Sequence, residues 1–367
     1  MHVIIAPDSF KGTASAAQVA AAIAGGVRQA APHATVITLP MADGGEGTAE
    51  ALANAASLNG HEVVTVTLPT TDAVGRLTEA SYFLAGDQAF IDVAAATGLP
   101  AVEGTLDPLH ADSYGTGVLI ADAESRGAKH IILGLGGSAS TDGGVGIVTA
   151  LGGAAHDERG YALPKGGAPL VRVDHIDTAQ LNMKAAMLDY TLLADTRAIP
   201  VQAATMYAPQ KGAEGEQIAL LAGALLQLCK ATDTDPQTEF FGAAGGLPIA
   251  LRWLSTTMWG NEEHIKVTPG GAFVAQALGL EDKIAQADLV ITGEGRFDEQ
   301  SLTGKVVGTV SELAAAHDVP VAIIAGSFAE DAPAIEALRA ELSGEGSVTE
   351  QLAQAARNVM AQAGAQG

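Results

Sequence analysis

The stretch IILGLGGSASTDGGVG, residues 131–146, joins a short apolar segment to a loop rich in glycine. Residues 131–133 have the length and composition of a buried strand. Six glycines follow within residues 134–146, together with three hydroxyl side chains and one aspartate. Because glycine has no Cβ, such a backbone can bring several N–H groups close to one anion. We therefore expect a strand that leads into an anion-binding loop, with a tight structural turn as the alternative.

Length and charge limit the classes of protein to which the chain can belong. Its 367 residues are enough for about two or three domains. The hydrophobic content of 48% is typical of a globular protein. A formal net charge of -23 opposes broad binding to nucleic acid or to an anionic membrane, since both need exposed cationic surface. The expected partner is a small molecule bound at a local site.

The single cysteine, Cys229, lies in an apolar run, where we expect a buried and inert thiol. The N-terminus, MHVIIAPDSF, has no charged leader and no long apolar segment, so we expect a cytoplasmic protein. The sequence leaves open whether the chain forms a homo-oligomer.

Both chain ends repeat one pattern, in which a predicted strand is followed by a polar loop. The strands are expected at residues 2–7, 35–39 and 288–292, and each following loop carries acids, glycines or a basic residue. Open parallel sheets bind ligands at the carboxyl ends of their strands, so these loops are candidates for a site. The alternative for Asp8 and Asp43 is N-capping of the helices that follow.

The middle of the chain has a different pattern. Alternating apolar and polar residues predict half-buried strands at 64–68, 77–84 and 89–94, so a second, partly antiparallel domain is expected there. A helix at 115–126 leads into the glycine-rich stretch, and a strand at 188–194 ends next to an aspartate.

The loops contain the residue types that phosphoryl transfer needs. These are anion donors, carboxylates for Mg²⁺, cations for the developing charge and a base near the acceptor hydroxyl. Neither a Walker A motif nor a protein-kinase catalytic loop is present. Residues 134–139 fit G-x-G-x-x-A, with Asp157 and Glu158 some twenty residues further on. That pattern alone would suggest an NAD(P)-dependent oxidoreductase acting on a small hydroxy acid, but residues 140–144 are poor helix starters.

Five blocks along the chain together resemble the bacterial glycerate kinase family. They are APDSFKG at 6–12, PMADGGEGT at 40–48, the glycine-rich residues 134–144, PQKGA at 209–213, and residues 291–305. The resemblance implies ATP-dependent phosphorylation of D-glycerate to 2-phosphoglycerate, with ATP and Mg²⁺ as cofactors.

The resemblance also implies an α/β fold with two domains. One is a Rossmann-like parallel-sheet domain built from both chain ends, residues 1–60 plus 285–367. The other is an inserted second α/β domain, residues 61–284, and the site is expected in the cleft between them.

One segment departs from the family pattern. Where the family has Cys-Asp-Val-x-Asn-Pro-Leu, this chain reads ADTRAIP at residues 194–200, so Asp195 is kept and Asn-Pro-Leu is not. The change puts the local loop shape in doubt. It also motivates a further alternative, a non-catalytic sugar-acid-binding relative.

The candidate residues follow from their chemistry. The acceptor hydroxyl has a pKa far above 7, so a carboxylate must take its proton late in the transfer, and Asp195 or Asp43 is the candidate. The expected catalytic residues are Asp43, Asp195 and Lys211. The expected metal ligands are Asp8, Glu46 and Glu294, because Mg²⁺ prefers oxygen. The expected binding residues for substrate and phosphate are Ser9, Lys11, Gly44, Gly45, Gly136, Gly137, Ser138, Asp142, Arg296, Asp298, Gln300 and Lys305.

Overall fold

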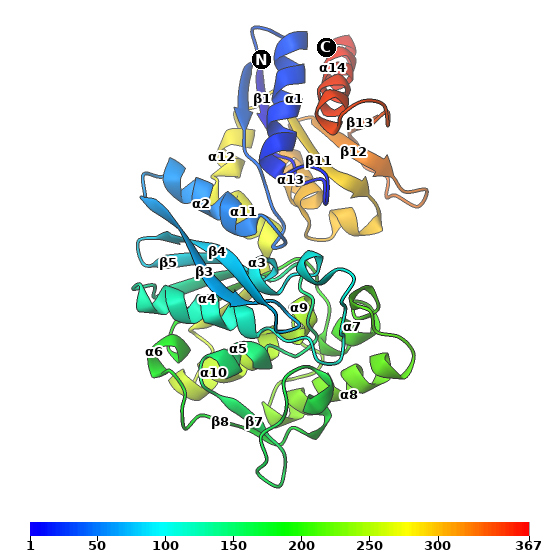
Figure 1. Ribbon diagram of the computed structural model, residues 1–367. Helices are drawn as coiled ribbons and strands as arrows, with labels where there is room; N and C mark the ends of the chain where they lie inside the picture. The colour runs from blue at the N-terminus through cyan, green and yellow to red at the C-terminus, as the bar shows by residue number, and fades with distance from the viewer. Residues whose placement is uncertain (367) are drawn as a thin grey trace. The chain divides into compact units, whose positions relative to one another are not determined.

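The computed structural model describes residues 1–366, which form two compact units (Figure 1). Unit 1 consists of residues 1–43 and 269–367, and unit 2 consists of residues 44–268. Each unit contains helices and a sheet of its own, so the predicted α/β class is confirmed. The domain boundaries expected from the sequence, at 60/61 and 284/285, differ from those of the two units and stay a prediction.

Unit 1 is built on a five-stranded sheet with the order β13-β12-β11-β1-β2. Every neighbouring pair in it is parallel. The strands are β1 (His2–Ile5), β2 (Thr35–Thr38), β11 (Leu289–Phe297), β12 (Val321–Phe328) and β13 (Leu338–Glu341). The chain reverses its direction of travel across the sheet between β1 and β11. Parallel sheets bind ligands at such a switch point, because the two loops that leave it diverge.

The helices of unit 1 cover the sheet. They are α1 (Ala16–Ala30), α11 (Gly270–Ala277), α12 (Leu280–Ile284), α13 (Val306–Ala316) and α14 (Val348–Gln366), with a short 3-10 helix at Glu299–Leu302. Residues of α1 and α14 share one core with alternate residues of β1, β11 and β12. The two helices pack so closely that a Cβ on Gly26 would lie 2.2 Å from the carbonyl oxygen of Ala353.

Two helices of unit 1, α1 and α14, begin with a capping box. At the start of α1, Ser15 Oγ accepts from Gln18 N, and Gln18 Oε1 accepts from Ser15 N. The same exchange joins Ser347 and Glu350 at the start of α14. These local contacts were readable from sequence because both partners lie within one turn.

Strand β11 extends further than the sequence indicates. The polar residues after Thr292 were expected to form a loop, yet the strand continues to Phe297. It continues because β12 supplies a parallel partner, with Arg296 paired to Ser327 and Phe297 paired to Phe328. Phe297 is fully buried there.

Unit 2 has a mixed six-stranded sheet with the order β10-β9-β6-β5-β4-β3. The strands are β3 (Val63–Thr71), β4 (Leu77–Ala85), β5 (Gln88–Asp92), β6 (His130–Gly134), β9 (Asp189–Ala194) and β10 (Ile265–Pro269). β3, β4 and β5 pair antiparallel, whereas β5, β6 and β9 pair parallel. The expected partly antiparallel character is confirmed. A separate pair joins β7 (Ala154–His156) to β8 (His175–Asp177).

The helices of unit 2 enclose a large apolar core. They are α2 (Thr48–Leu58), α3 (Val93–Thr97), α4 (Tyr114–Ser125), α5 (Val145–Ala150), α6 (Met183–Ala186), α7 (Pro200–Thr205), α8 (Glu216–Ala231), α9 (Ala243–Gly246) and α10 (Pro248–Trp259). Cys229 on α8 is buried, as expected, and burial raises the pKa of its thiol to about 11.

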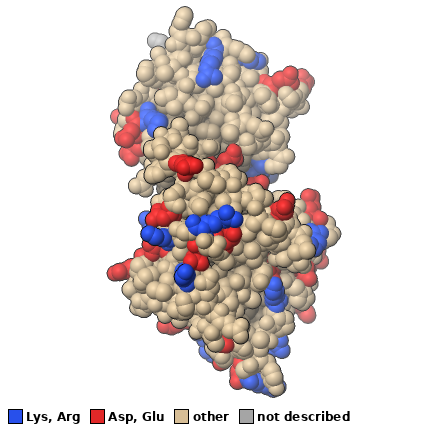
Figure 2. Space-filling model, turned by 60° about the vertical axis from the view of Figure 1, so that its left-hand side comes forward, with Lys and Arg blue, Asp and Glu red and all other residues tan. Residues whose placement is uncertain are grey.

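Surface charge is divided into small groups. On the face drawn in Figure 2, Lys and Arg appear as separate patches with Asp or Glu beside several of them. Among residues 1–366, no helix is both long enough and apolar enough to cross a membrane.

Candidate functional site

Unit 1 has a cavity of about 580 Å³ at the carboxyl ends of its strands. It lies where the loops after β1 and β2, the end of β11 and the start of α14 meet. The expected site residues that line it are Asp8, Ser9, Lys11, Asp43, Glu294, Arg296, Asp298 and Lys305. The structure thus brings together acids and cations that come from both ends of the chain.

Three acids of this cavity are almost fully buried, Asp43 at 4% exposed, Glu294 at 7% and Asp8 at 8%. Burial, and then repulsion by Asp43, raises the pKa of Asp8 to about 8, against a hydrogen bond from Ser9 N. Burial raises the pKa of Glu294 to about 7, although a hydrogen bond with Ser301 lowers it. Glu294 Oε1 is buried and has no hydrogen-bond partner in the structure. A buried oxygen left in this way fits a cationic ligand.

Asp298 and Gln300 were both expected at the site, but only Asp298 lines the cavity. Asp298 lines the cavity and caps the 3-10 helix by accepting from Gln300 N at 2.9 Å. Gln300 is exposed, and it is not among the residues that line the cavity.

Several lining residues were missed from the sequence. They are Phe10, Thr13, Gly295, Gly326, Ser327, Leu342, Gly344, Val348 and Gln351. Of these, Phe10 and Gly295 lie in two of the blocks on which the family resemblance rests. The segment that contains Leu342 and Gly344 follows β13, a strand too short and too exposed to give a clear sequence pattern.

Unit 2 carries the other expected residues around the glycine-rich loop. Gly136 N donates to Gly44 O at 2.8 Å, and Leu135 N donates to Leu193 O at 3.0 Å. A Cβ on Gly136 would lie 2.5 Å from Gly45 Cα and 2.8 Å from Asp195 Oδ2. Three segments, the loops after β6 and β9 and the one before α2, therefore meet where only glycine fits.

Asp142 is buried, at 1% exposed, and accepts hydrogen bonds within the loop region. Its Oδ2 accepts from Ser113 N, Ser113 Oγ and Gly146 N at 2.8–2.9 Å. Its Oδ1 accepts from Ser140 Oγ at 3.0 Å and Gly144 N at 3.4 Å. These bonds account for Asp142 without a ligand, so its contacts are those of a residue that shapes the loop.

Lys211 is a buried cation, at 3% exposed, on the 3-10 helix Pro209–Lys211. Its Nζ donates to Ser138 Oγ at 3.0 Å and to Ser140 O. Burial lowers the pKa of this amine to about 8, although Asp142 and Asp195 raise it. The glycine-rich loop therefore has a local positive charge that comes from a segment distant in sequence.

Asp92 was missed by the sequence analysis. Its Oδ2 accepts from Gly47 N and its Oδ1 from Ala49 N, both at 2.9 Å, so it fixes the loop before α2. Burial raises its pKa to about 7. An acid at the end of a predicted strand is a signal that would have found it. Glu46, in the same loop, is exposed, and so is Gly137.

The dinucleotide alternative has little structural support. The fingerprint needs a helix that opens directly at the glycines, so that its N-terminus faces the pyrophosphate. Here the helix after the loop, α5, begins only at Val145.

A metal site is not preassembled within residues 1–366. No group of three or more His, Cys, Asp or Glu side chains is placed there to hold an ion. The buried and unpartnered Oε1 of Glu294 is the feature that best fits a cation.

Comparison with known proteins gives one family. The model described as "Glycerate kinase family" matches residues 3–365. The "Glycerate kinase" of Halalkalibacterium halodurans is 38% identical over 345 residues, covering 91% of this chain and 87% of the relative. The "Glycerate 2-kinase" of Escherichia coli K12 is 39% identical over 342 residues, covering 90% of this chain and 86% of the relative. A solved structure, "putative glycerate kinase 2" from Salmonella typhimurium LT2, has a TM-score of 0.77 at 36% identity and covers 100% of this chain and 99% of its own.

Proposed function

Because this chain belongs to the glycerate kinase family and is a kinase, we propose that it transfers the γ-phosphoryl group of ATP to D-glycerate and forms 2-phosphoglycerate. The family match over residues 3–365 supports the acceptor, and the name of the E. coli relative supports the position. The structural observation that carries the proposal is the buried ammonium of Lys211 at the glycine-rich loop, in the same unit as the half-buried carboxylate of Asp195.

In the proposed reaction the 2-hydroxyl oxygen of glycerate attacks the γ-phosphorus. The new O–P bond forms while the bond to the bridging oxygen of ADP breaks, and the hydroxyl proton passes to a carboxylate. Asp195 is our candidate for that base, because its Oδ2 lies against Gly136 in the loop that would hold the acceptor. Asp43, which lines the cavity of unit 1, is the second candidate.

Lys211 would stabilise the charge that develops on the transferred group. With a pKa of about 8, the amine is still mostly protonated at neutral pH. A buried cation acts more strongly on nearby charge than an exposed one, since less water screens it. In our proposal Ser138 and Gly137 bind the carboxylate of the acceptor, and Gly44 and Gly45 complete that site. The N–H of Gly136 already donates to Gly44 O, so Gly136 shapes the loop together with Asp142.

The residues of unit 1 would serve the nucleotide and its metal. Mg²⁺, when bound, would neutralise negative charge on the phosphates. We propose Asp8 and Glu294 as its oxygen ligands, and Ser9, Lys11, Arg296, Asp298 and Lys305 as residues that bind substrate or phosphate. Gln300 was also expected there, but its side chain is exposed, so it has the weakest support. Glu46, which was also expected as a metal ligand, belongs to unit 2.

Phosphorus NMR of the reaction products tests the function directly. We expect ATP, Mg²⁺ and D-glycerate to give ADP and 2-phosphoglycerate. A signal from 3-phosphoglycerate would contradict the position, and the absence of any phosphoglycerate would support a non-catalytic sugar-acid-binding relative. Addition of NADH and a keto acid, followed at 340 nm, would detect the oxidoreductase alternative.

A further inference from the structure

The cavity of unit 1 lies at the switch point of its sheet, between the loops that follow β1 and β11. Its volume of about 580 Å³ falls in the range of roughly 300–1,000 Å³ that is usual for sites of cofactor-sized ligands. A three-carbon acid would leave most of that space empty. The size therefore favours a larger molecule than glycerate.

Gly295 lines this cavity, and neither backbone conformation nor packing explains why it is glycine. Its φ is not in the left-handed region, and a Cβ there would make only ordinary contacts, at 3.7 Å from Phe10 Cα and 3.8 Å from Lys11 N. Glycine within a strand destabilises it relative to alanine. Neighbouring Gly326 differs, because a Cβ there would lie 2.3 Å from Gly295 O. Since neither the backbone conformation nor the packing requires glycine at residue 295, we attribute it to a ligand that approaches the backbone there.

The cations that line the cavity come from segments close to Gly295. Arg296 follows it in β11, Lys11 N lies 3.8 Å from the position of a Cβ on Gly295, and Lys305 follows the 3-10 helix after β11. Glu294 Oε1 is buried without a hydrogen-bond partner. Cations beside a bare backbone suit phosphate oxygens, and the unpartnered carboxylate oxygen suits a cation carried with them.

Uncharged lining residues come from the segment after β13, the edge strand that β12 separates from β11. Among them, Leu342 and Val348 are partly buried against the core of unit 1. Gly344 lies between these two in sequence, and Ser327 belongs to β12. Apolar side chains with a few polar groups form a typical surface for a flat ring.

We propose that the cavity of unit 1 is the nucleotide site, with the phosphates against Gly295 and Lys305 and the base against Leu342 and Val348. This inference rests on the proposed function, since it assigns the nucleotide of that reaction to one unit and leaves the glycine-rich loop of unit 2 to the acceptor.

Calorimetric titration of ADP with Mg²⁺, in the absence of glycerate, tests the phosphate end. We expect Gly295→Ala to weaken ADP binding and Gly295→Val to weaken it by about tenfold or more, because the added methyl groups occupy space that the ligand needs. The melting temperature of Gly295→Ala should be unchanged or higher. Gly25→Ala is the matched control: a Cβ on Gly25, like one on Gly295, would meet no close contact, and Gly25 lies within α1, away from the cavity lining. It should leave ADP affinity unchanged.

Leu342→Ala tests the base end. It should weaken binding of ADP and leave binding of inorganic tripolyphosphate unchanged, whereas Gly295→Val should weaken both. Equal effects of Leu342→Ala on the two compounds would overturn the placement of the base.

Two outcomes separate this inference from the proposed function. If wild-type protein phosphorylates glycerate but Gly295→Val keeps its ADP affinity, or raises only the KM for glycerate, the nucleotide lies elsewhere and the inference is wrong. If wild-type protein binds ADP and Gly295→Val abolishes that binding, but no acceptor is phosphorylated, the inference stands and the proposed function fails.

Discussion

At the scale of single residues, the buried position of Lys211 is the feature with the clearest consequence for activity. Its ammonium is held by Ser138 and Ser140, and a sequence could not show that this lysine is buried. Lysine is rarely buried without a partner, because the desolvation of a charge is costly. Its retention at the glycine-rich loop therefore points to a role in binding or catalysis.

We predict that Lys211→Met lowers kcat by about a hundredfold or more, since one preorganised charge at the transferred group is typically worth that much. Methionine keeps the volume of the side chain and removes only the charge, so the melting temperature should change little. Steady-state kinetics and thermal unfolding of the same preparation check both points. A fall in stability that matches the fall in activity would show that the lysine is structural.

The same residue predicts a pH dependence. Since the pKa of Lys211 is lowered to about 8, turnover at saturating substrate should fall as pH rises through about 8, where the ammonium loses its proton. In Lys211→Arg the charge persists, so any residual activity should lack this fall. Stability should change with pH in the opposite direction to activity. The pKa of Lys211 in the folded state lies below the unfolded value of 10.5, so the buried charge destabilises the fold below pH 8. That cost is relieved as pH rises from 8 towards 10.5. A flat rate profile to pH 10 would contradict the assignment.

At the scale of elements, Asp142 holds the glycine-rich loop between β6 and α5. Asp142→Asn would place an amide N–H₂ where backbone N–H groups of Ser113 and Gly146 now donate. We expect a loss of stability on the order of 2 kcal/mol, as for a buried and charged acceptor. Chemical denaturation measures it, and Ser140→Ala, which removes one donor only, should cost less. Unchanged stability with lost activity would instead support the direct binding role expected from the sequence.

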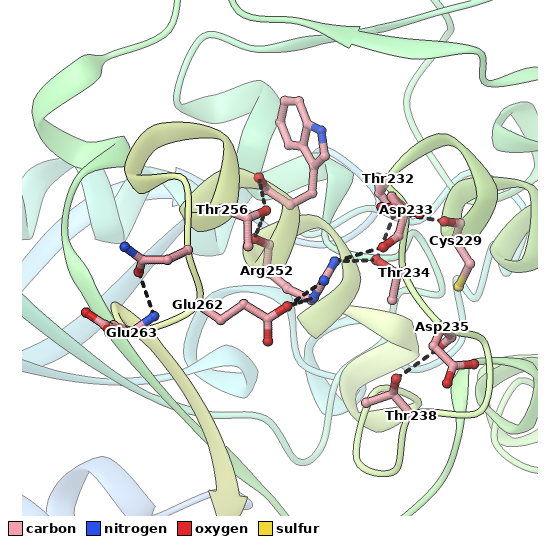
Figure 3. Close-up of polar contacts among 12 residues, drawn as sticks. Cys229, Thr232, Asp233, Thr234, Asp235, Thr238, Arg252, Thr256, Glu262 and Glu263 are labelled. Carbon is pink, nitrogen blue, oxygen red and sulfur yellow. Dashed lines mark hydrogen bonds and ion pairs between the residues drawn. The ribbon is translucent and has the colours of Figure 1, made fainter.

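Arg252 joins α10 to the turn that follows α8, as Figure 3 shows. Its guanidinium donates to Glu262 Oε1 at 2.8 Å and to Asp233 O at 3.1 Å. Arg252→Lys keeps the positive charge but loses the planar guanidinium, which can donate to two partners at once. We expect it to lower the free energy of unfolding by about 1 kcal/mol, because Glu262 is largely exposed and the ion pair is screened.

Kinetics give the control for Arg252→Lys. Because Arg252 and Glu262 lie outside the candidate site residues, kcat and both KM values should stay at the wild-type level. Altered KM values without altered stability would show that this cluster is coupled to the site.

At the scale of the whole molecule, the chain has two units with separate cores. We predict that scanning calorimetry gives a calorimetric enthalpy larger than the van't Hoff enthalpy, because two cooperative units do not unfold as one. If ADP binds in unit 1, it should raise the midpoint of one component more than the other. A single transition with equal enthalpies would mean that the units unfold together.

The sequence by itself determined the local elements and the residue types of the site. The capping boxes at Ser15 and Ser347, the apolar strands and the strand-then-polar-loop pattern follow from contacts within a few residues, and such contacts are written in sequence order. The acids and cations of the cavity in unit 1 were named because each follows a predicted strand. Only the tertiary structure decided which of these groups are buried, which share a cavity and which hold a loop. The sequence alone does not distinguish Asp142, Asp92 and Lys211 from helix caps or from charged residues on the surface. Likewise, β11 continues through Phe297 only because it pairs with β12. Burial and long-range pairing depend on segments far apart along the chain, and for that reason local pattern cannot fix them.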